Sequence, residues 1–220
     1  NIDENSIETI DYLPLKNETK LPTFYQKSVT QLFKSKSPYV NSVPTKNENL
    51  PEKGILIHKV LEMGWLDLND INEINDWINK KDIHFQKKII NLDLILLIEK
   101  LQENKHVLFI QSLPANECFK ELWLQSLITS VDNHINIILT GIIDVLYKKN
   151  NQWFILDYKS GKSSEKNEIY TKQIQAYLHL LKDAFGIEAI GQILYLEDNK
   201  LISIPSNKNL FSQLGIFNNV

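Results

Sequence analysis

The sequence predicts an α/β domain in which a mixed central sheet is flanked by helices. Apolar residues at helical spacing dominate the first half of the chain, whereas the second half carries the alternating and continuous apolar runs of strands. One helical segment, residues 166–184, separates two predicted hairpins. A helix that crosses between two hairpins places parallel strands beside antiparallel ones, so the sheet is expected to be mixed.

The N-terminal region is predicted to be largely irregular. Residues 1–53 hold five of the seven prolines and few long apolar runs, so we expect an extended lead-in or linker from a larger protein. Within it, residues 28–33 predict a short helical patch. The chain starts with Asn, and its single methionine is Met63, which favours a segment of something longer. The predicted folded domain is residues 54–220.

The periodicity of this domain predicts its elements in order. Helices are expected over 54–65, near 69–81 and near 86–103. Strands are then expected over 106–112, 119–128, 135–148 and 152–159.

The last third of the chain is predicted to add one helix and a second hairpin. Ser163 and Ser164 can cap the helix over 166–184, and Gly186 can end it. The hairpin combines strands at 192–196 and 201–204 around a turn at 198–199.

Composition narrows the class of protein. A hydrophobic content of 43% and a charged content of 23% are ordinary for a soluble globular chain. The single cysteine, Cys118, excludes disulfides within the chain and multi-cysteine metal sites. No apolar run reaches membrane length, and the net charge of −3 does not by itself indicate a nucleic-acid binder. A reducing, cytoplasmic setting is therefore expected.

The first predicted hairpin brings charged residues together. If Asn150 and Asn151 form a two-residue turn, Asp144 lies directly across from Asp157. Lys159 lies two residues beyond Asp157, so it projects from the same face. Opposed side chains in a sheet have Cβ atoms about 5 Å apart, so the pattern predicts two carboxylates and one ammonium in a single cluster.

Such a cluster is unfavourable unless a cation binds to it. Two carboxylates about 5 Å apart repel by roughly 3 kcal/mol at an effective dielectric constant near 20. Mg²⁺ takes oxygen ligands, commonly one or two carboxylates together with a substrate phosphate. The spacing therefore predicts a metal site that handles phosphate. The alternative from spacing alone is an exposed hairpin on which Lys159 neutralises one carboxylate.

Other motifs accompany this hairpin in a fixed order. They are Gly54-x-x-x-His58-x-x-Leu61-Glu62, Glu121 in a strand, Gly141-Ile-Ile-Asp144, Asp157-Tyr-Lys159-Ser-Gly161, and Tyr170-x-x-Gln173-x-x-x-Tyr177. Together they resemble the RecB-type nuclease domain of the PD-(D/E)XK superfamily, over about residues 54–180. The resemblance implies a restriction-endonuclease-like fold. Asp157 stands where many superfamily members have Glu, as is usual in the RecB branch.

The resemblance also implies a role for each matching residue. Asp144, Asp157, His58 and the backbone carbonyl of Tyr158 are expected to bind the metal, and Glu121 is a further acidic candidate that competes with Glu117. Lys159 is expected to position the attacking water or to offset charge at the phosphate. Gln173 and Tyr177 are expected to contact the substrate. Without the resemblance, His58 would be read as a core or surface histidine, and Tyr177 and Gln173 could equally be plain core and plain surface.

The function implied is that of a Mg²⁺-dependent DNA exonuclease, with Mn²⁺ as an alternative because of the histidine. The resemblance implies that it is part of a bacterial RecB- or AddA-like helicase–nuclease that acts in double-strand-break repair. Its expected partners are a single DNA strand, a helicase segment of the same polypeptide, and RecC/RecD- or AddB-like subunits, with no membrane partner.

Three other functions stay open from the sequence. The chain could be a free-standing repair or phage nuclease of the same superfamily. It could be a non-catalytic nuclease-like scaffold that binds DNA, although such relatives typically lose an acidic ligand or the lysine. It could also be an RNA or nucleotide phosphodiesterase, because the motif residues would recognise only the phosphate of a substrate.

Overall fold

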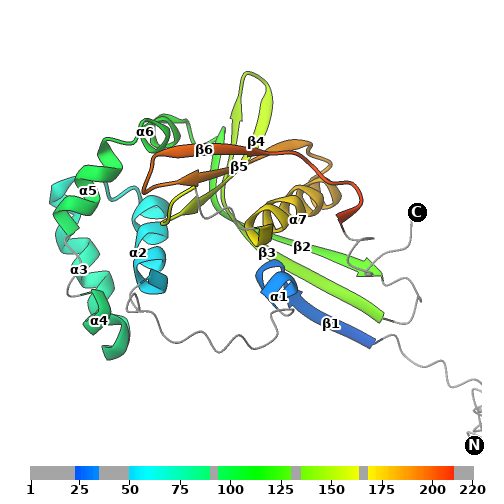
Figure 1. Cartoon of the computed structure of the whole chain (residues 1–220), viewed down its shortest axis with the longest axis horizontal. Coiled ribbons are helices and arrows are strands. Elements are labelled where there is room, and N and C mark those ends of the chain that lie inside the picture. Colours follow the sequence, from blue (N-terminus) through cyan, green and yellow to red (C-terminus); the bar gives the residue numbers. More distant parts are fainter. Residues whose placement is uncertain (1–22, 35–49, 90–93, 130–134, 164–167, 211–220) are drawn as a thin grey trace, which may run out of the picture.

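The computed structural model describes residues 23–34, 50–89, 94–129, 135–163 and 168–210. These residues form an α/β structure with a mixed sheet and helices on both of its faces, as predicted (Figure 1). No helix among them is both long enough and apolar enough to cross a membrane.

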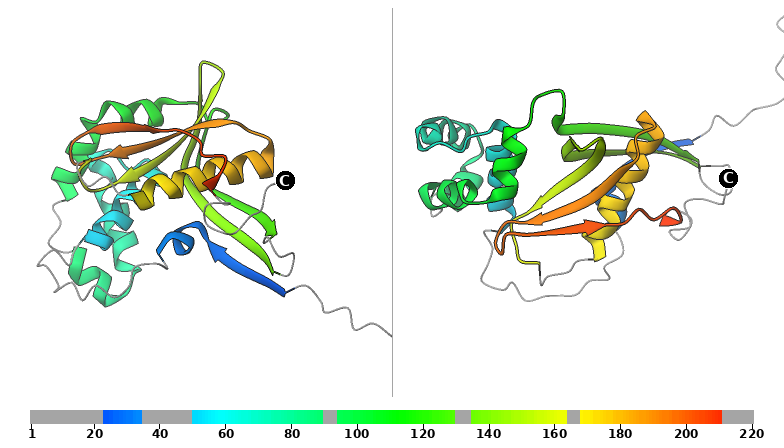
Figure 2. Two further views of the ribbon diagram at one scale, coloured as in Figure 1. Left: turned by 45° about the vertical axis from the view of Figure 1, so that its right-hand side comes forward. Right: turned by 90° about the horizontal axis from the view of Figure 1, so that it is seen from above.

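The sheet has six strands in the order β1-β3-β4-β5-β6, with β2 paired to β3 outside this path. The strands are β1 Thr23–Ser28, β2 Cys118–Thr129, β3 Ile135–Lys149, β4 Gln152–Lys159, β5 Ala189–Tyr195 and β6 Lys200–Ile204. β1 and β3 are parallel, as are β4 and β5, and the other neighbours are antiparallel. Figure 2 shows these strands from two further sides.

The long strand β3 organises this sheet, because β1, β2 and β4 all pair with it. β2 pairs with β3 over residues 136–147 and so occupies one edge of it. The other edge is shared, because β1 pairs with residues 135–140 and β4 pairs with residues 145–149. The sheet therefore forks on this edge, and residues 141–144 of β3 lie at the fork.

Two hydrophobic clusters hold helices against the two faces. One cluster joins the sheet to the helices of residues 50–112, through buried side chains such as Leu56, Val60 and Leu61. These helices are α2 Leu50–Met63, η1 Leu68–Asp70, α3 Ile71–Asn79, α4 Ile83–Ile89, α5 Leu94–Gln102 and α6 Lys105–Ser112. The other cluster joins the sheet to α1 Val29–Lys34 and α7 Glu168–Phe185. α7 contributes Ile174, Leu178 and Leu181, the spacing of one helix face.

Several predicted boundaries are confirmed. The strands predicted over 119–128, 135–148 and 152–159 are β2, β3 and β4 to within one residue at each end. The helix predicted over 54–65 is α2, which begins earlier, at Leu50, and ends at Met63, before Gly64 with a φ of 73°. Gly186, with a φ of 67°, ends α7 as predicted, because a left-handed residue after the last turn carries no Cβ penalty at glycine.

The strand predicted over 106–112 is wrong, because these residues form α6. Asn104 caps this helix, with its side chain accepting hydrogen bonds from the backbone N–H groups of His106 and Val107. Val107 and Ile110, one turn apart, are both buried. A short apolar run does not distinguish a strand from a buried helix, and here the cap decides for the helix.

Two further predictions need correction. The single helix predicted over 86–103 is instead α4 and α5, on either side of residues outside the described ranges. The predicted cap at Ser163 is wrong, since its hydroxyl and its N–H both donate to Asp198, and Ser164 lies outside the described residues.

Part of the predicted lead-in belongs to the folded structure. Residues 23–34 form β1 and α1; β1 hydrogen-bonds along β3, and Val29 is fully buried. β1 is a strand because it pairs with β3, and the local pattern of residues 1–53 gave no sign of this strand. Residues 1–22 and 35–49 lie outside the described ranges, and a linker there stays a prediction.

Candidate functional site

The predicted hairpin register is confirmed, and it organises the site. Lys149 pairs with Gln152 and Tyr147 pairs with Phe154, so Asn150 and Asn151 form the turn, both with positive φ. The last pair of this ladder is Val145 with Leu156. One residue further, at the fork, Asp144 is level with Asp157.

A third acidic residue lies at the same level on the opposite edge of β3. Lys120 pairs with Val145 and Leu122 pairs with Ile143, so Glu121 stands across from Asp144. Glu121 itself is left out of the ladder and has a φ of 50°, a left-handed conformation that is uncommon for a glutamate. Three neighbouring strands therefore present a carboxylate at one level of the sheet.

His58 joins this level from α2. Its Nδ1 is 3.3 Å from Asp144 Oδ1, and its Nε2 is 3.1 Å from the backbone oxygen of Tyr158. The other oxygen of Asp144, Oδ2, accepts a hydrogen bond of 2.8 Å from the N–H of Tyr158. The apolar side chains of α2, buried against the sheet, orient the helix so that His58 faces the fork.

Lys159 and Asp157 form an ion pair on β4. Asp157 is only 3% exposed, and this burial raises the pKa of its carboxyl group, with the charge of Lys159 opposing the shift and that of Asp144 adding to it. Burial also disfavours the ammonium of Lys159, but the carboxylates of Asp157 and Asp144 outweigh it and raise its pKa. Lys159 therefore stays charged at neutral pH.

The electrostatics at His58 indicate a site built for a positive charge. Burial disfavours the imidazolium, yet the hydrogen bond to Asp144 and the charges of Asp144 and Asp157 outweigh burial and raise the pKa of His58 to about 9. Burial raises the pKa of Glu121 to about 7, and the nearby charge of Asp144 adds to the shift. A bound cation would counter such a rise in carboxyl pKa, because its positive charge stabilises the ionised carboxylate.

A pocket of about 340 Å³ contains all the predicted side chains. Its lining includes His58, Glu121, Asp144, Asp157, Lys159, Gln173 and Tyr177. Tyr158 contributes its carbonyl through the contact with His58. The structure thus brings together residues from α2, β2, β3, β4 and α7 that are up to 119 positions apart in the chain.

Gln173 and Tyr177 form the wall of the pocket on α7. The Gln173 amide donates to the Tyr177 hydroxyl over 2.9 Å, which orients both side chains. Tyr177 approaches β3 closely at Gly141, where an added Cβ would lie 2.6 Å from the ring. A side chain at this position of the fork would displace the tyrosine.

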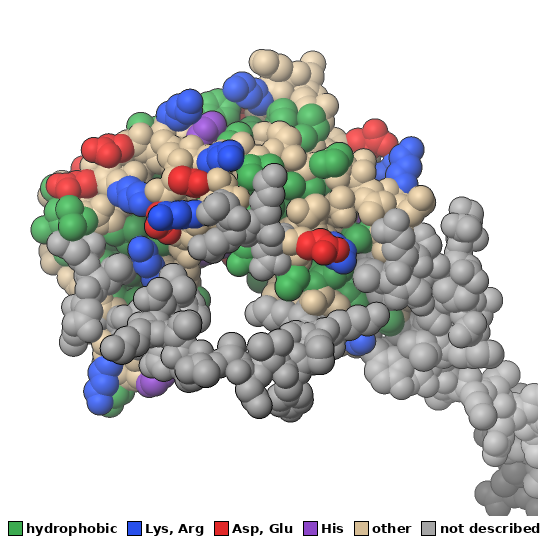
Figure 3. Space-filling view, in the orientation of Figure 1, with side chains coloured by type: hydrophobic (Ala, Val, Ile, Leu, Met, Phe, Trp, Pro, Cys, Tyr) green, Lys and Arg blue, Asp and Glu red, His purple; other side chains and the backbone are tan. Residues whose placement is uncertain are grey.

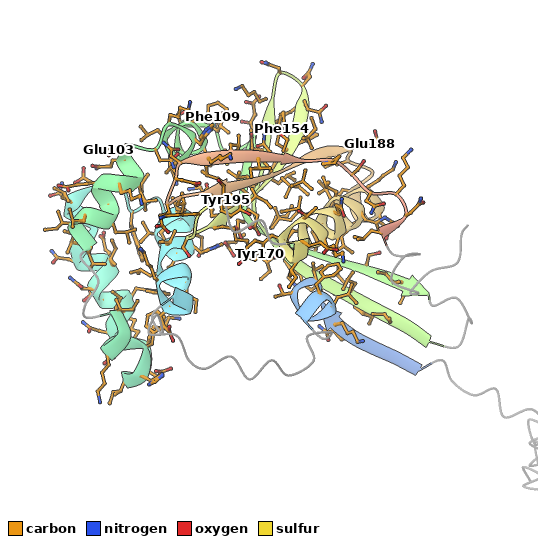
Figure 4. All side chains as sticks on the ribbon, viewed as in Figure 1. Glu103, Phe109, Phe154, Tyr170, Glu188 and Tyr195 are labelled. Carbon is orange, nitrogen blue, oxygen red and sulfur yellow. The ribbon has the colours of Figure 1, made fainter. Side chains whose placement is uncertain are left out.

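Two features in or beside the pocket are not predicted by the sequence. The Tyr170 ring lies on the first turn of α7 (Figure 4), and the Lys159 ammonium is 4.6 Å from its centre. Trp123 and Ile142 also line the pocket. Tyr170 stood in the recognised motif and was assigned no role. The only signal for Trp123 and Ile142 was their position two residues from Glu121 and Asp144 along the strands.

The residues present fit a divalent cation. Among the described residues, His58, Glu121 and Asp144 can each direct one ligand atom to a common point, with these atoms within 4.8 Å of one another. The 3.3 Å between His58 Nδ1 and Asp144 Oδ1 is close to the roughly 3 Å between adjacent ligands of an octahedral ion at about 2.1 Å. Asp157 lies in the same pocket but is paired with Lys159.

The mixed central sheet flanked by helices places the chain in the class of restriction-endonuclease-like folds. The family model of the PD-(D/E)XK nuclease superfamily matches residues 24–211, and the chain belongs to this superfamily. It is also similar to AddA-type ATP-dependent helicase/nuclease subunits. Identity is 25% over 169 residues with that of Clostridioides difficile and 30% over 166 residues with that of Clostridium botulinum. Each match covers 66% of this chain but only 13% and 12% of the relative.

A substitution of His58 should weaken metal binding without disturbing the fold. We expect His58→Ala to weaken Mn²⁺ binding about tenfold or more, since it removes one predicted ligand and the contact with Asp144. Isothermal titration calorimetry with Mn²⁺ measures the change. His84→Ala, at an exposed histidine on α4, is the matched control and should bind like the unmodified chain. Equal affinities for all three proteins would contradict the assignment.

The pKa of Glu121 predicts a pH dependence of stability in metal-free buffer. Its pKa rises from 4.5 to about 7 on folding, so the folded state holds the proton more tightly, and stability is lost as pH rises through this interval. Glu121→Gln removes the loss and should melt at a higher temperature than the unmodified protein at pH 8. The difference should disappear towards pH 4.5. Thermal melts by circular dichroism in EDTA test this, and a constant difference at both pH values would refute it.

Proposed function

We propose that this chain is a divalent-metal-dependent deoxyribonuclease domain that hydrolyses phosphodiester bonds. The observation that carries the proposal is the convergence of His58, Asp144, Asp157 and Lys159 in one pocket at the fork of the sheet. Membership of the nuclease superfamily supports it. Mg²⁺ is the metal proposed, with Mn²⁺ as the alternative that the histidine favours.

The metal would be held by Asp144, His58, the Tyr158 carbonyl and Asp157, with Glu121 as a further ligand. When bound, it would supply Lewis-acid charge relief at the phosphate and a more acidic water. His58 gives its imidazole nitrogen to the site only after losing a proton, because its pKa lies near 9. The contact with the Tyr158 N–H holds the Asp144 carboxylate in place, so one of its oxygens stays directed at the site.

Lys159 would act at the phosphate. Its ammonium is held between Asp157 and the Tyr170 ring, so little reorganisation is needed when negative charge develops there. It can donate a hydrogen bond to the attacking water or to a phosphoryl oxygen. Gln173 and Tyr177, oriented by their mutual hydrogen bond, would contact the substrate on the α7 side of the pocket.

The relatives support a wider proposal about the whole protein. Because the curated relatives are helicase/nuclease subunits and the chain spans about an eighth of their length, we propose that the domain works with a helicase segment. In this proposal it degrades a single strand as an exonuclease during double-strand-break repair, in the bacterial cytoplasm, beside RecC/RecD- or AddB-like subunits.

One assay tests the activity directly. End-labelled single-stranded and double-stranded DNA, incubated with and without Mg²⁺, should be shortened only in the presence of the metal. A calorimetric titration with Mn²⁺ accompanies it. A saturable metal site with no cleavage of either substrate would contradict the nuclease, and the absence of both would indicate a scaffold without catalytic function.

A further inference from the structure

Two apolar side chains beside the acidic residues are about half exposed in the described part of the structure. Trp123 of β2 and Ile142 of β3 are register partners, so their side chains lie next to each other on the sheet. Trp123 is 56% exposed and Ile142 is 48% exposed, yet both line the same pocket as the acidic residues. Together they form an apolar shelf at the pocket, and we use this name for the pair.

Packing of the domain does not account for this shelf. On β2, Leu124 and Ile128 are buried in the cluster on the α7 side, and Trp123 alternates with them. The tryptophan therefore points to the opposite face of the strand. The other three tryptophans, Trp65, Trp77 and Trp153, are all partly buried against the core clusters. Trp123 instead lines the pocket.

The shelf lies at a defined distance from the acidic level of the sheet. Trp123 follows Glu121 by two residues and Ile142 precedes Asp144 by two, which corresponds to about 7 Å along each strand. If a phosphate is held at the acidic residues, the base of the same nucleotide or of the adjoining one would therefore lie above the shelf. The pocket volume of about 340 Å³ is at the lower end of small-ligand pockets and is enough for about one nucleotide.

Charge alone does not explain how a strand would be held here. The chain has a net charge of −3, and on the face shown in Figure 3 lysines and acidic side chains are interspersed. Stacking on an exposed aromatic ring supplies attraction that needs no basic groove and that tolerates any base. Only an unpaired base can present its face to such a ring.

We propose that Trp123, supported by Ile142, is the stacking platform for one unpaired base of the strand whose phosphate occupies the acidic site. The inference rests on the proposed nuclease function and deepens it, because it names the residue that would select a single strand as the substrate. The shelf would bind any unpaired base and would not distinguish one base from another.

The test measures binding of a fluorescein-labelled oligothymidylate strand by anisotropy, with Ca²⁺ in place of Mg²⁺. Trp123→Ala should weaken binding about tenfold or more, and Trp123→Phe, which keeps an aromatic face, should recover most of the affinity. Phe185→Ala removes an aromatic side chain that is 57% exposed at the end of α7, outside the pocket, and should bind like the unmodified protein. Mn²⁺ affinity should be the same in all of these variants.

A second measurement uses the unmodified chain. An abasic site moved along the strand one nucleotide at a time should lower affinity at one position, and this position should lose its effect in Trp123→Ala. A scan with no such position, or equal strand binding by Trp123→Ala and the unmodified chain, would overturn the shelf while metal-dependent cleavage still supports the nuclease. If Trp123→Ala instead changes only self-association in size-exclusion chromatography, the shelf is a protein contact and the proposal is wrong.

Discussion

Replacing Lys159 or Asp157 with alanine should abolish Mg²⁺-dependent DNA degradation. Lys159→Ala removes the positive charge that the pocket would present to the phosphate in the proposed mechanism, and the loss of one preorganised donor typically lowers kcat by about 10²–10³. Asp157→Ala removes a proposed ligand and should bring cleavage below detection. The rates of shortening of end-labelled single strands measure both effects.

The variants must be shown to fold, because either one leaves a buried charge without its partner. Such a change can be strongly destabilising, so each protein is checked by its thermal melt. Asp157→Asn combined with Lys159→Met keeps the shape and removes both charges, and it should be folded and inactive. Lys182→Ala breaks the exposed pair with Glu188 and should keep full activity. Full cleavage by a folded Lys159→Ala or Asp157→Ala protein would refute the mechanism.

Gly191→Ala should destabilise the fold more than any surface change. On β5, an added Cβ would lie 2.3 Å from Ile174 Cγ2 and 3.2 Å from the backbone oxygen of Ile204. Neither α7 nor β6 can yield without disturbing the core, and overpacking of this kind typically costs about 1–3 kcal/mol. The free energy of unfolding from denaturant titration should fall by about this amount.

Gly54→Ala is the matched control and should act in the opposite direction. Among the described residues, the added Cβ in α2 would meet only Ser160 Oγ, at 3.9 Å, and alanine is a better helix former than glycine by about 1 kcal/mol. The free energy of unfolding should therefore rise. Equal changes in the free energy of unfolding for the two substitutions would contradict the idea that Gly191 is needed for close packing of α7 on β5.

Local signals predicted much of the fold. The hairpin register followed from two asparagines, which tolerate the positive φ of the turn, and from alternation within the flanking strands. Once the register was known, the alignment of Asp144 with Asp157 followed, since opposed residues in a sheet are close neighbours. The wrong strand at 106–112 has the same origin, because a short apolar run carries no period of its own and only the cap at Asn104 distinguished it.

Other features of the site required contacts between distant segments. β1 was missed, as its strand character depends on pairing with β3, more than a hundred residues later in the chain. The left-handed conformation of Glu121, which accompanies its exclusion from the ladder, has no signature in the sequence. The exposure of Trp123 could not be foreseen either, because an aromatic residue in a strand is normally assigned to the core.

By itself, the sequence determined the hairpin, its register and the group of charged residues that it carries, because these depend on neighbours in the chain and on the alternation of a strand. Tertiary structure alone decided that β1 and β4 share one edge of β3 and open a fork, and that His58 and the α7 side chains meet Asp144 there. The physical reason is that strand pairing and helix packing are set by the burial of complete apolar faces, and no local pattern specifies which faces meet.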